Sequence, residues 1–234
     1  MNTNSNLYTF IYASVMVILV AAALAFTNGA LKEKQAKNIQ IDKMQQILRS
    51  VKIEAETPKA EALYNKIITK AFLVNSKGEV TDTSASATFG TDISKEVIKK
   101  SDKRLLPVYE AILNGERKYI IPVYGAGLWG PIWGYVALNG DKNTIFAASF
   151  SHQGETPGLG AEIATKAFQK QFTGKELFKG GVFKSLAVLK SGHKAEGQDA
   201  VDGISGGTIT SKGLEAMLQN SIGAYDSFLK IKEK

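Results

Sequence analysis

The residues best suited to chemistry lie in a run of glycine and hydroxyl side chains close to the C-terminus. Residues 202–211 read Asp-Gly-Ile-Ser-Gly-Gly-Thr-Ile-Thr-Ser. Apolar residues at helical spacing follow the run: Leu214, Met217, Leu218, Ile222, Tyr225 and Leu229. This spacing, with threonine and serine just ahead of it, predicts a helix that begins around Thr210. A glycine-rich turn before a helix presents backbone N–H groups beside the positive end of the helix dipole, an arrangement that suits a phosphate group.

The same run has a plainer interpretation, in which it is a flexible turn followed by a capped helix. Serine, threonine and glycine favour such positions whether or not a ligand binds. If a phosphate is held here, the backbone N–H groups of Gly206, Gly207 and Thr208 would neutralise most of its charge, together with the helix dipole.

Residues 205–210, Ser-Gly-Gly-Thr-Ile-Thr, resemble the Ser-Gly-Ala-Thr-x-Thr signature of bacterial FMN-binding domains. That family carries flavin mononucleotide (FMN) through a phosphoester to the last threonine of the signature. The resemblance therefore implies Thr210 as the attachment point, with Ser205 beside it in the signature. Gly207 stands where the family usually has alanine, so the turn has one methyl group fewer.

Two further segments resemble the same family, and they occur in the expected order. Residues 151–160 contain Gly-Glu-Thr-Pro-Gly-Leu-Gly, and residues 127–138 resemble the stretch that precedes it in the C subunits of sodium-translocating NADH:quinone reductases. With the apolar N-terminus, the resemblance covers most of the chain.

The resemblance implies an electron-carrying subunit of a membrane complex that oxidises NADH, reduces quinone and exports sodium, with no independent catalytic site of its own. Covalent FMN would be the cofactor, and a separate flavin transferase that uses FAD as donor would modify Thr210. The other reductase subunits and the bacterial inner membrane would be its partners. The large domain would lie on the periplasmic side. The chain contains no motif for NADH, quinone or sodium.

An isoalloxazine ring needs an apolar or aromatic wall and a few polar contacts. The candidates for the wall are Leu128, Trp129 and Leu159. The candidates for polar contacts are Glu155, Thr156 and the backbone around Gly158. Each has an ordinary alternative: the tryptophan could belong to the core, Pro-Gly at 157–158 could be a type II turn, and the glutamate could form a salt bridge.

Two other functions remain open. One is the homologous G subunit of the ferredoxin-linked electron-transport complex, which has the same flavin chemistry and other partners. The second is a membrane-tethered binding module without flavin.

Two motifs match well-known signatures in letters alone. Residues 125–130 fit Gly-x-Gly-x-x-Gly, but a proline and a strand-like run follow instead of a helix, so a dinucleotide site is rejected. Residues 203–207 fit Gly-x-Ser-x-Gly, but both histidines precede the serine, and the residues before Gly203 are too polar for a buried strand. A hydrolase is therefore rejected.

Composition excludes further classes of function. The chain has no cysteine and two isolated histidines, which excludes thiolate chemistry and argues against a transition-metal site. The net charge of +7 comes from lysines interleaved with acids, without the aromatic platforms that single-strand binding uses, so nucleic acid is not expected as a partner.

Residues 7–26 form a stretch without charge or proline that is long enough to cross a bilayer core of about 30 Å. A cleavable signal peptide is the alternative, because Ala23-Leu24-Ala25 fits a cleavage pattern, but the leader lacks basic residues and the apolar run is long. The lysines at 32, 34 and 37 would keep the following domain in the cytoplasm, opposite to the side that the resemblance implies.

The remaining pattern predicts an α+β fold: an N-terminal transmembrane helix, then one FMN-binding domain with a mainly antiparallel sheet flanked by helices. The expected boundaries are an anchor at 1–30, a helical juxtamembrane segment at 31–57 and the domain at 58–234. Helices are expected at 30–52, 58–72 and 162–172. Residues 72–74 and 79–81 are expected to form a hairpin, and further strands are expected at 118–124, 132–138, 144–150 and 182–189.

Overall fold

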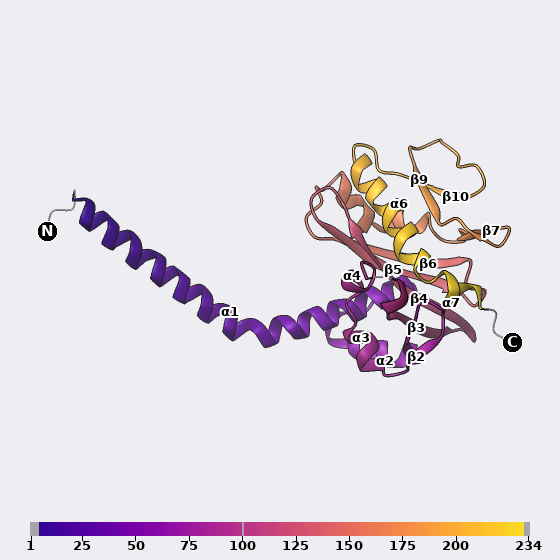
Figure 1. The fold of residues 1–234 in the computed structure, drawn as a ribbon, viewed down its shortest axis with the longest axis horizontal. Helices are drawn as coiled ribbons and strands as arrows, with labels where there is room; N and C mark the ends of the chain where they lie inside the picture. Colours follow the sequence, from indigo (N-terminus) through magenta and orange to yellow (C-terminus); the bar gives the residue numbers. More distant parts are fainter. Residues whose placement is uncertain (1–4, 100, 232–234) are drawn as a thin grey trace. The chain divides into compact units, whose positions relative to one another are not determined.

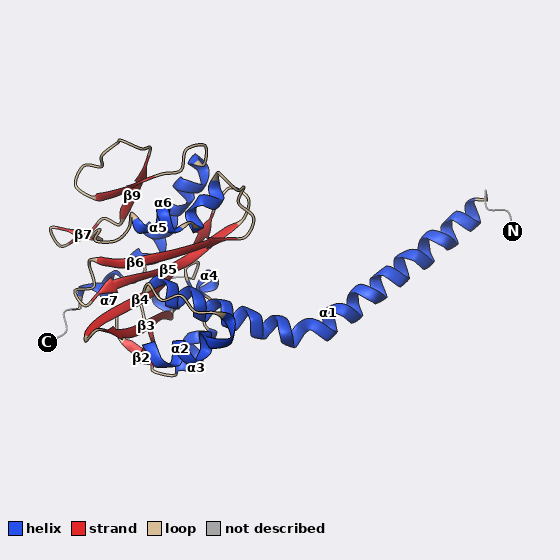
Figure 2. Cartoon of the chain, turned by 180° about the vertical axis from the view of Figure 1, so that it is seen from behind, coloured by secondary structure: helices blue, strands red, loops and turns tan. Residues whose placement is uncertain are grey.

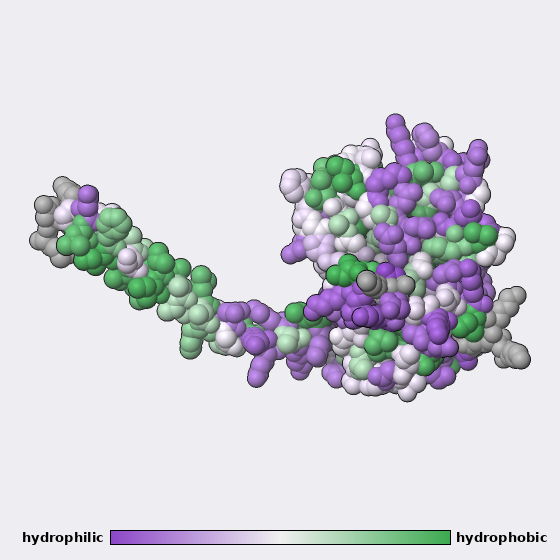
Figure 3. Space-filling model, in the orientation of Figure 1, coloured by the Kyte–Doolittle hydropathy of each residue, from purple (hydrophilic) through white to green (hydrophobic). Residues whose placement is uncertain are grey.

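The computed structural model describes residues 5–99 and 101–231. The chain divides into two compact units, one ending at Lys43 and one beginning at Met44. Helix α1 (Asn6–Ser50) runs through this boundary. It contains a stretch long and apolar enough to span a membrane, none of which is buried within the protein. Figure 3 shows hydrophobic residues gathered along the N-terminal part of α1, with hydrophilic residues following.

The second unit is built on a six-stranded sheet in the order β2-β1-β3-β4-β5-β6, antiparallel throughout. Figure 1 colours the strands by their position along the sequence. Their bounds are β1 Ile68–Val74, β2 Val80–Asp82, β3 Leu106–Leu113, β4 Glu116–Ala126, β5 Pro131–Asn139 and β6 Ile145–His152. The sheet confirms the expected α+β class with a mainly antiparallel sheet.

Short elements and two longer helices complete the unit. The helical elements are η1 Thr57–Lys59, α2 Ala60–Ile67, α3 Ala85–Gly90, α4 Ile93–Glu96, η2 Ser101–Lys103, η3 Gly160–Ala164, α5 Lys166–Lys170, α6 Thr208–Gly223 and α7 Asp226–Lys230. Two small strand pairs lie outside the sheet: β7 Phe178–Lys179 with β8 Val182–Phe183, antiparallel, and β9 Leu186–Leu189 with β10 Asp199–Asp202, parallel. Figure 2 shows the helices in blue and the strands in red.

Both faces of the sheet are covered, because alternate residues of each central strand enter different cores. Tyr119, Ile121 and Val123 of β4 face a core that α5, α6 and α7 complete, and Ile120 faces the other. The second core also holds Ile47 and other residues from the end of α1, with α2 and α3. Covering both faces makes the central strands apolar without alternation.

Several expected elements differ from the observed ones. The expected helix at 58–72 ends at Ile67, and the chain continues as β1, because residues 71–74 are all buried between the two cores. The expected helix at 162–172 is a 3₁₀ turn followed by α5, and the expected strand at 182–189 is two short strands.

Strand β3 was not expected at all. It carries Pro107 next to its start and is buried on both faces over its first six residues, so it lacks the alternation that marks a strand. The helix expected from around Thr210 is observed as two helices: α6, which begins at Thr208 with Gly207 at its N-cap, and α7, which carries Leu229.

Candidate functional site

The glycine and hydroxyl run connects strand β10 to helix α6. Gly203 N–H donates to the Leu189 carbonyl at 2.6 Å, and Ile204 N–H donates to Ser211 Oγ at 3.0 Å. The segment before Gly203 is strand β10, in which only Val201 is buried, in agreement with the expectation that it is too polar for a buried strand. It pairs in parallel with β9, and Asp202 at its end is exposed. A hydrolase is also excluded because both histidines precede Ser205 in the chain.

Thr210 lies in the first turn of α6, and its hydroxyl points into the protein. The residue is 1% exposed, and its Oγ1 donates a hydrogen bond of 2.5 Å to Glu155 Oε2. A bond this short between a hydroxyl and a carboxylate is typical of a charge-assisted hydrogen bond. Thr208, in contrast, is exposed. The two threonines of the signature thus differ sharply in their environment.

Glu155 connects the three segments that carry the family resemblance. It is 4% exposed and lies in the loop after β6. Its Oε1 accepts the N–H of Trp129 at 2.8 Å, and its own N–H donates to His152 Nδ1 at 3.1 Å. It forms no ion pair with any cation of the described residues. The salt-bridge alternative for Glu155 is therefore wrong.

Two glycines make room for this carboxylate. A Cβ atom at Gly160 would overlap Glu155 Oε2 and would lie 2.5 Å from Thr210 Oγ1. A Cβ atom at Gly127 would overlap Glu155 Oε1. Both residues are glycines of the matching segments, but the sequence pattern alone gives neither a role in the site. Their role becomes visible only once the carboxylate is placed.

The backbone donors at the start of α6 differ in part from the expectation. Gly207 N–H is buried and already donates to the Ile204 carbonyl at 3.0 Å, so it is not available to a phosphate. The first-turn N–H groups of Thr208, Ile209 and Thr210 have no acceptor within the helix, as at any helix start. Gly206 has a φ of +76°, which glycine adopts without strain.

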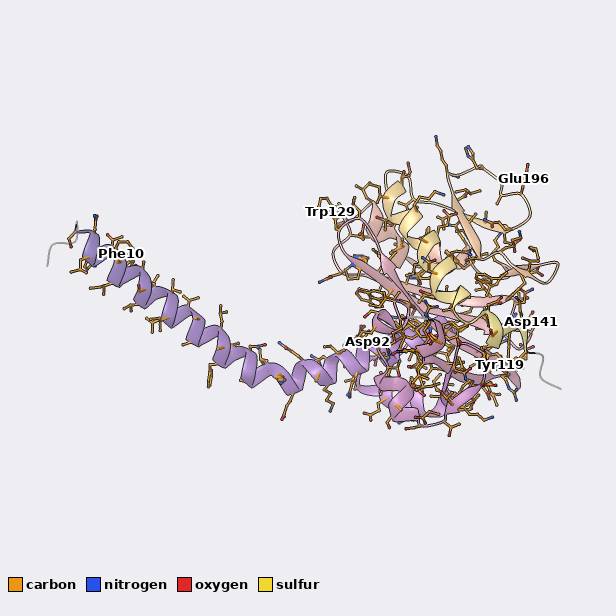
Figure 4. The ribbon with its side chains drawn as sticks, in the orientation of Figure 1. Phe10, Asp92, Tyr119, Trp129, Asp141 and Glu196 are labelled. Carbon is orange, nitrogen blue, oxygen red and sulfur yellow. The ribbon has the colours of Figure 1, made fainter. Side chains whose placement is uncertain are left out.

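The apolar candidates for a ring wall lie on the surface. Trp129 is 67% exposed, Leu128 47% and Leu159 41%, so the alternative that Trp129 belongs to the core is wrong. Trp129 projects from the β4–β5 loop, at the opposite end of the sheet from Asp141 (Figure 4). Leu159 reaches Gly206, because a Cβ atom there would lie 2.7 Å from its Cδ2. Ile209, 60% exposed on α6, is an apolar neighbour of Thr210 that the motif analysis did not name.

The Pro-Gly step forms a type II turn. Leu159 N–H donates to the Thr156 carbonyl at 3.1 Å across Pro157 and Gly158, and Gly158 has a φ of +74°. Gly158 N–H is already bound to Glu162 Oε1 at 3.2 Å, so this donor is not open to a ring heteroatom. The side chain of Thr156 is exposed and stays a candidate.

A cavity of about 910 Å³ opens beside the β4–β5 loop. Its lining includes Gly127 and Gly130 of the β4–β5 loop, Arg104, and Gln219 and Asn220 of α6. This volume is within the range of ligand pockets. The described residues contain no cluster of metal-ligating side chains.

Fold and sequence together define a class of protein. A model of the FMN-binding domain family matches residues 127–223, from the β4–β5 loop to the end of α6. The C subunit of the Na⁺-translocating NADH-quinone reductase of Vibrio vulnificus is 28% identical over 230 residues, covering 92% of this chain and 90% of that protein. Its counterpart from Haemophilus ducreyi is 31% identical over 217 residues, covering 86% and 84%.

A solved structure agrees with these relatives. The crystal structure of the corresponding protein from Parabacteroides distasonis is 50% identical and superimposes with a TM-score of 0.81, covering 87% of this chain and 98% of that one. The chain belongs to the family of C subunits of the Na⁺-translocating NADH-quinone reductase.

Proposed function

We propose that this protein is the subunit of a sodium-pumping NADH:quinone reductase that carries electrons through an FMN joined by a phosphoester to Thr210. The observation that carries the proposal is the environment of this hydroxyl. Thr210 Oγ1 lies at the start of α6, and its hydrogen bond to Glu155 brings together the three segments typical of the family. When bound, FMN supplies reversible electron transfer.

The residues around Thr210 fit the parts of such a group. The first-turn N–H groups and dipole of α6 would hold the phosphodiester, with Ser205, Gly206 and Thr208 beside it. Exposed Leu128, Trp129 and Leu159 supply apolar surface for a ring that stays open to redox partners. A covalent link removes the need for a deep pocket, because the cofactor cannot dissociate.

The surroundings of the subunit follow from the same proposal. The apolar part of α1 would anchor the protein in the bacterial inner membrane, and the flavin domain would lie on the periplasmic side. The partners would be the other reductase subunits and a flavin transferase. Protease added to right-side-out vesicles tests the orientation, since protection of the domain would contradict it.

The attachment site is tested by substitution of the two threonines. Co-expressed with a flavin transferase, the purified wild type should stay yellow after denaturation and gain the mass of one FMN. Thr210→Ala should abolish the attached flavin, because no other hydroxyl of the described residues is hydrogen-bonded to Glu155. Thr210→Ser, which keeps a hydroxyl, should retain flavin.

Thr208→Ala is the matched control and should be flavinylated like the wild type. A colourless wild type of unmodified mass would contradict the flavoprotein assignment. Flavin retained on Thr210→Ala and lost on Thr208→Ala would move the attachment point to Thr208.

A further inference from the structure

We propose that the edge of strand β6 is a docking groove for an extended, acidic segment of a partner polypeptide. A cavity of about 880 Å³ lies along this edge. It is lined by residues 147–151 of β6, by Arg49 and Lys52 at the end of α1, and by Lys166 and Lys170 of α5. None of the described residues proposed to hold the flavin lines this cavity, so the inference does not depend on the proposed function.

The backbone of β6 directs hydrogen-bonding groups into the cavity. β6 is the last strand of the sheet order, next to β5 (Figure 2), and its register is continuous over residues 147–152. Gln153 N–H donates to the Pro131 carbonyl at 3.0 Å, so every second residue counted back from Gln153 also pairs with β5. The N–H and C=O groups of Ala148 and Phe150 therefore point away from β5. The Phe150 carbonyl agrees with this, because it accepts Gln169 Nε2 of α5 at 3.0 Å.

The outward groups of these two residues are those that a further strand would pair with. Among the described residues, nothing is hydrogen-bonded to Ala148 N–H, Ala148 C=O or Phe150 N–H. Both residues are buried, and buried backbone groups are almost always paired. A donor and an acceptor on one residue can exchange two hydrogen bonds with a neighbouring antiparallel strand. A simple anion only accepts and would leave the Ala148 carbonyl unpaired, so the groups favour a polypeptide.

A side chain in the cavity supplies an independent observation. Ser149 lines the cavity and is 5% exposed, and its hydroxyl takes part in no hydrogen bond of the described residues. Its Oγ is not fully enclosed, so it can be reached from the cavity. A hydroxyl both donates and accepts, and it can therefore meet a carboxylate or an amide of the docked segment.

The charges around the cavity determine the chemistry of the segment. Arg49 and Lys52 stand on one wall, and Lys166 and Lys170 stand on the other. Among the described lining residues, Glu54 is the only acid. It pairs with Lys166 at 2.9 Å, but both side chains are largely exposed, so the pair contributes little stability and can open. Cations on both walls favour acidic side chains on the bound segment.

A second copy of this chain does not meet that requirement. The chain has a net charge of +7, and two such edges would bring their lysines together. Lysine beside a sheet edge is a common means of preventing pairing between copies of one protein. The same lysines attract an acidic strand of another protein. The groove would thus select its partner by charge and hold it by backbone hydrogen bonds.

The experiment measures binding of a labelled synthetic heptapeptide, Val-Glu-Val-Glu-Val-Glu-Val, to the purified, detergent-solubilised full chain by fluorescence anisotropy. Saturable binding with a Kd below about 1 mM is expected at low salt. The same peptide N-methylated at its central residues keeps its charge but loses backbone donors, and it should bind at least about tenfold more weakly. A peptide with lysine in place of glutamate should not bind.

A charge reversal on the wall locates the bound peptide. Lys170 has no side-chain ion pair or hydrogen bond among the described residues, and Lys170→Glu should weaken binding at least about fivefold. Lys77→Glu is the matched control, because Lys77 is exposed in the β1–β2 turn, at the other end of the sheet order. This variant should bind the peptide like the wild type.

Each other outcome overturns the inference. No saturable binding of the valine–glutamate peptide excludes the groove as a site for an acidic strand. Equal affinity for the N-methylated peptide, or full displacement by an equal concentration of inorganic phosphate, would show a site for simple anions. Unchanged binding by folded Lys170→Glu would place the peptide elsewhere. If Lys170→Glu does not fold, the N-methylated peptide decides, because it requires no change in the protein.

Discussion

At the scale of single residues, the site depends on a carboxylate that three distant segments enclose. Glu155 accepts hydrogen bonds from Trp129 and Thr210, which are separated from it by 26 and 55 positions. Its oxygens lie where Gly127 and Gly160 lack side chains. Gly127 and Gly160 are thus needed for space beside the carboxylate, because neither has a positive φ.

This requirement predicts the effect of one methyl group at position 160. Gly160→Ala should lower the free energy of unfolding by about 1–3 kcal/mol, the usual cost of overpacking, because its Cβ meets Glu155 Oε2 and Thr210 Oγ1. The substitution should also reduce flavin attachment, because the added methyl group pushes the side chains of Glu155 and Thr210 apart. Denaturant unfolding and intact mass measure the two effects.

Gly154→Ala is the control for this substitution. Its Cβ would meet only the Trp129 carbonyl oxygen, at an ordinary 3.8 Å, so its stability should be close to that of the wild type. Equal stability of the two alanine variants would show that the space at Gly160 is not tight.

At the scale of elements, helix α6 positions Thr210 because it is fastened closely to β4. A Cβ atom at Gly213 would overlap the carbonyl oxygen of Ala126 at the end of that strand. Two turns further along, Ser221 Oγ accepts Tyr124 N–H at 3.1 Å and donates to the Tyr124 carbonyl at 3.0 Å. One hydroxyl thus satisfies both backbone groups of a strand residue, and helix and strand keep a fixed register.

Removing that hydroxyl should loosen the contact between helix and strand. Ser221 is fully buried, so Ser221→Ala leaves the half-buried backbone N–H and C=O groups of Tyr124 without this partner and should cost about 1 kcal/mol of stability. Thermal or denaturant unfolding measures the loss. Ser191→Ala, at an exposed serine, is the control and should be nearly neutral. A Ser221 variant as stable as the control would exclude the contact as a determinant of stability.

At the scale of the whole molecule, the sheet separates two cores, and both contain buried tyrosines. Tyr64 and Tyr109 belong to the core beside the end of α1, and Tyr225 belongs to the core beneath α6. Burial raises the pKa of all three phenols well above the usual value near 10. Tyr225 OH also donates to the Pro107 carbonyl at 2.9 Å, which joins the C-terminal segment to β3.

The raised pKa values predict a loss of stability in alkali. The folded state keeps these protons after the unfolded state has released them, so the stabilisation is complete below pH 10 and falls as the pH rises toward the folded pKa values. Each tyrosine should contribute a slope of about 1.4 kcal/mol per pH unit. Denaturant unfolding between pH 9 and pH 11 measures the slope, and absorbance at 295 nm reports ionisation.

Tyr64→Phe keeps the edge-on packing against Phe89 and should lower the slope by the contribution of one tyrosine, about 1.4 kcal/mol per pH unit. If the phenols of Tyr64, Tyr109 and Tyr225 titrate near pH 10 in the folded protein without loss of stability, burial does not raise their pKa values.

The sequence by itself determined the parts of this protein whose information is local. Composition and spacing predict the apolar N-terminal helix, the helix after the glycine and hydroxyl run, the β1–β2 hairpin and the strands β4–β6. The structure confirms these elements within a few residues. The motifs also identified the family, because fixed spacing within short segments survives at low overall identity.

Only the tertiary structure decided which residues meet. The sequence pattern does not predict strand β3, because burial on both faces removes the alternation that marks a strand, nor β10, because it is short and polar. The contact between Thr210 and Glu155 joins residues whose separation along the chain carries no information about distance. Sequence patterns report backbone preference and burial, whereas a contact between distant side chains depends on sheet register and helix packing, which only the complete fold fixes.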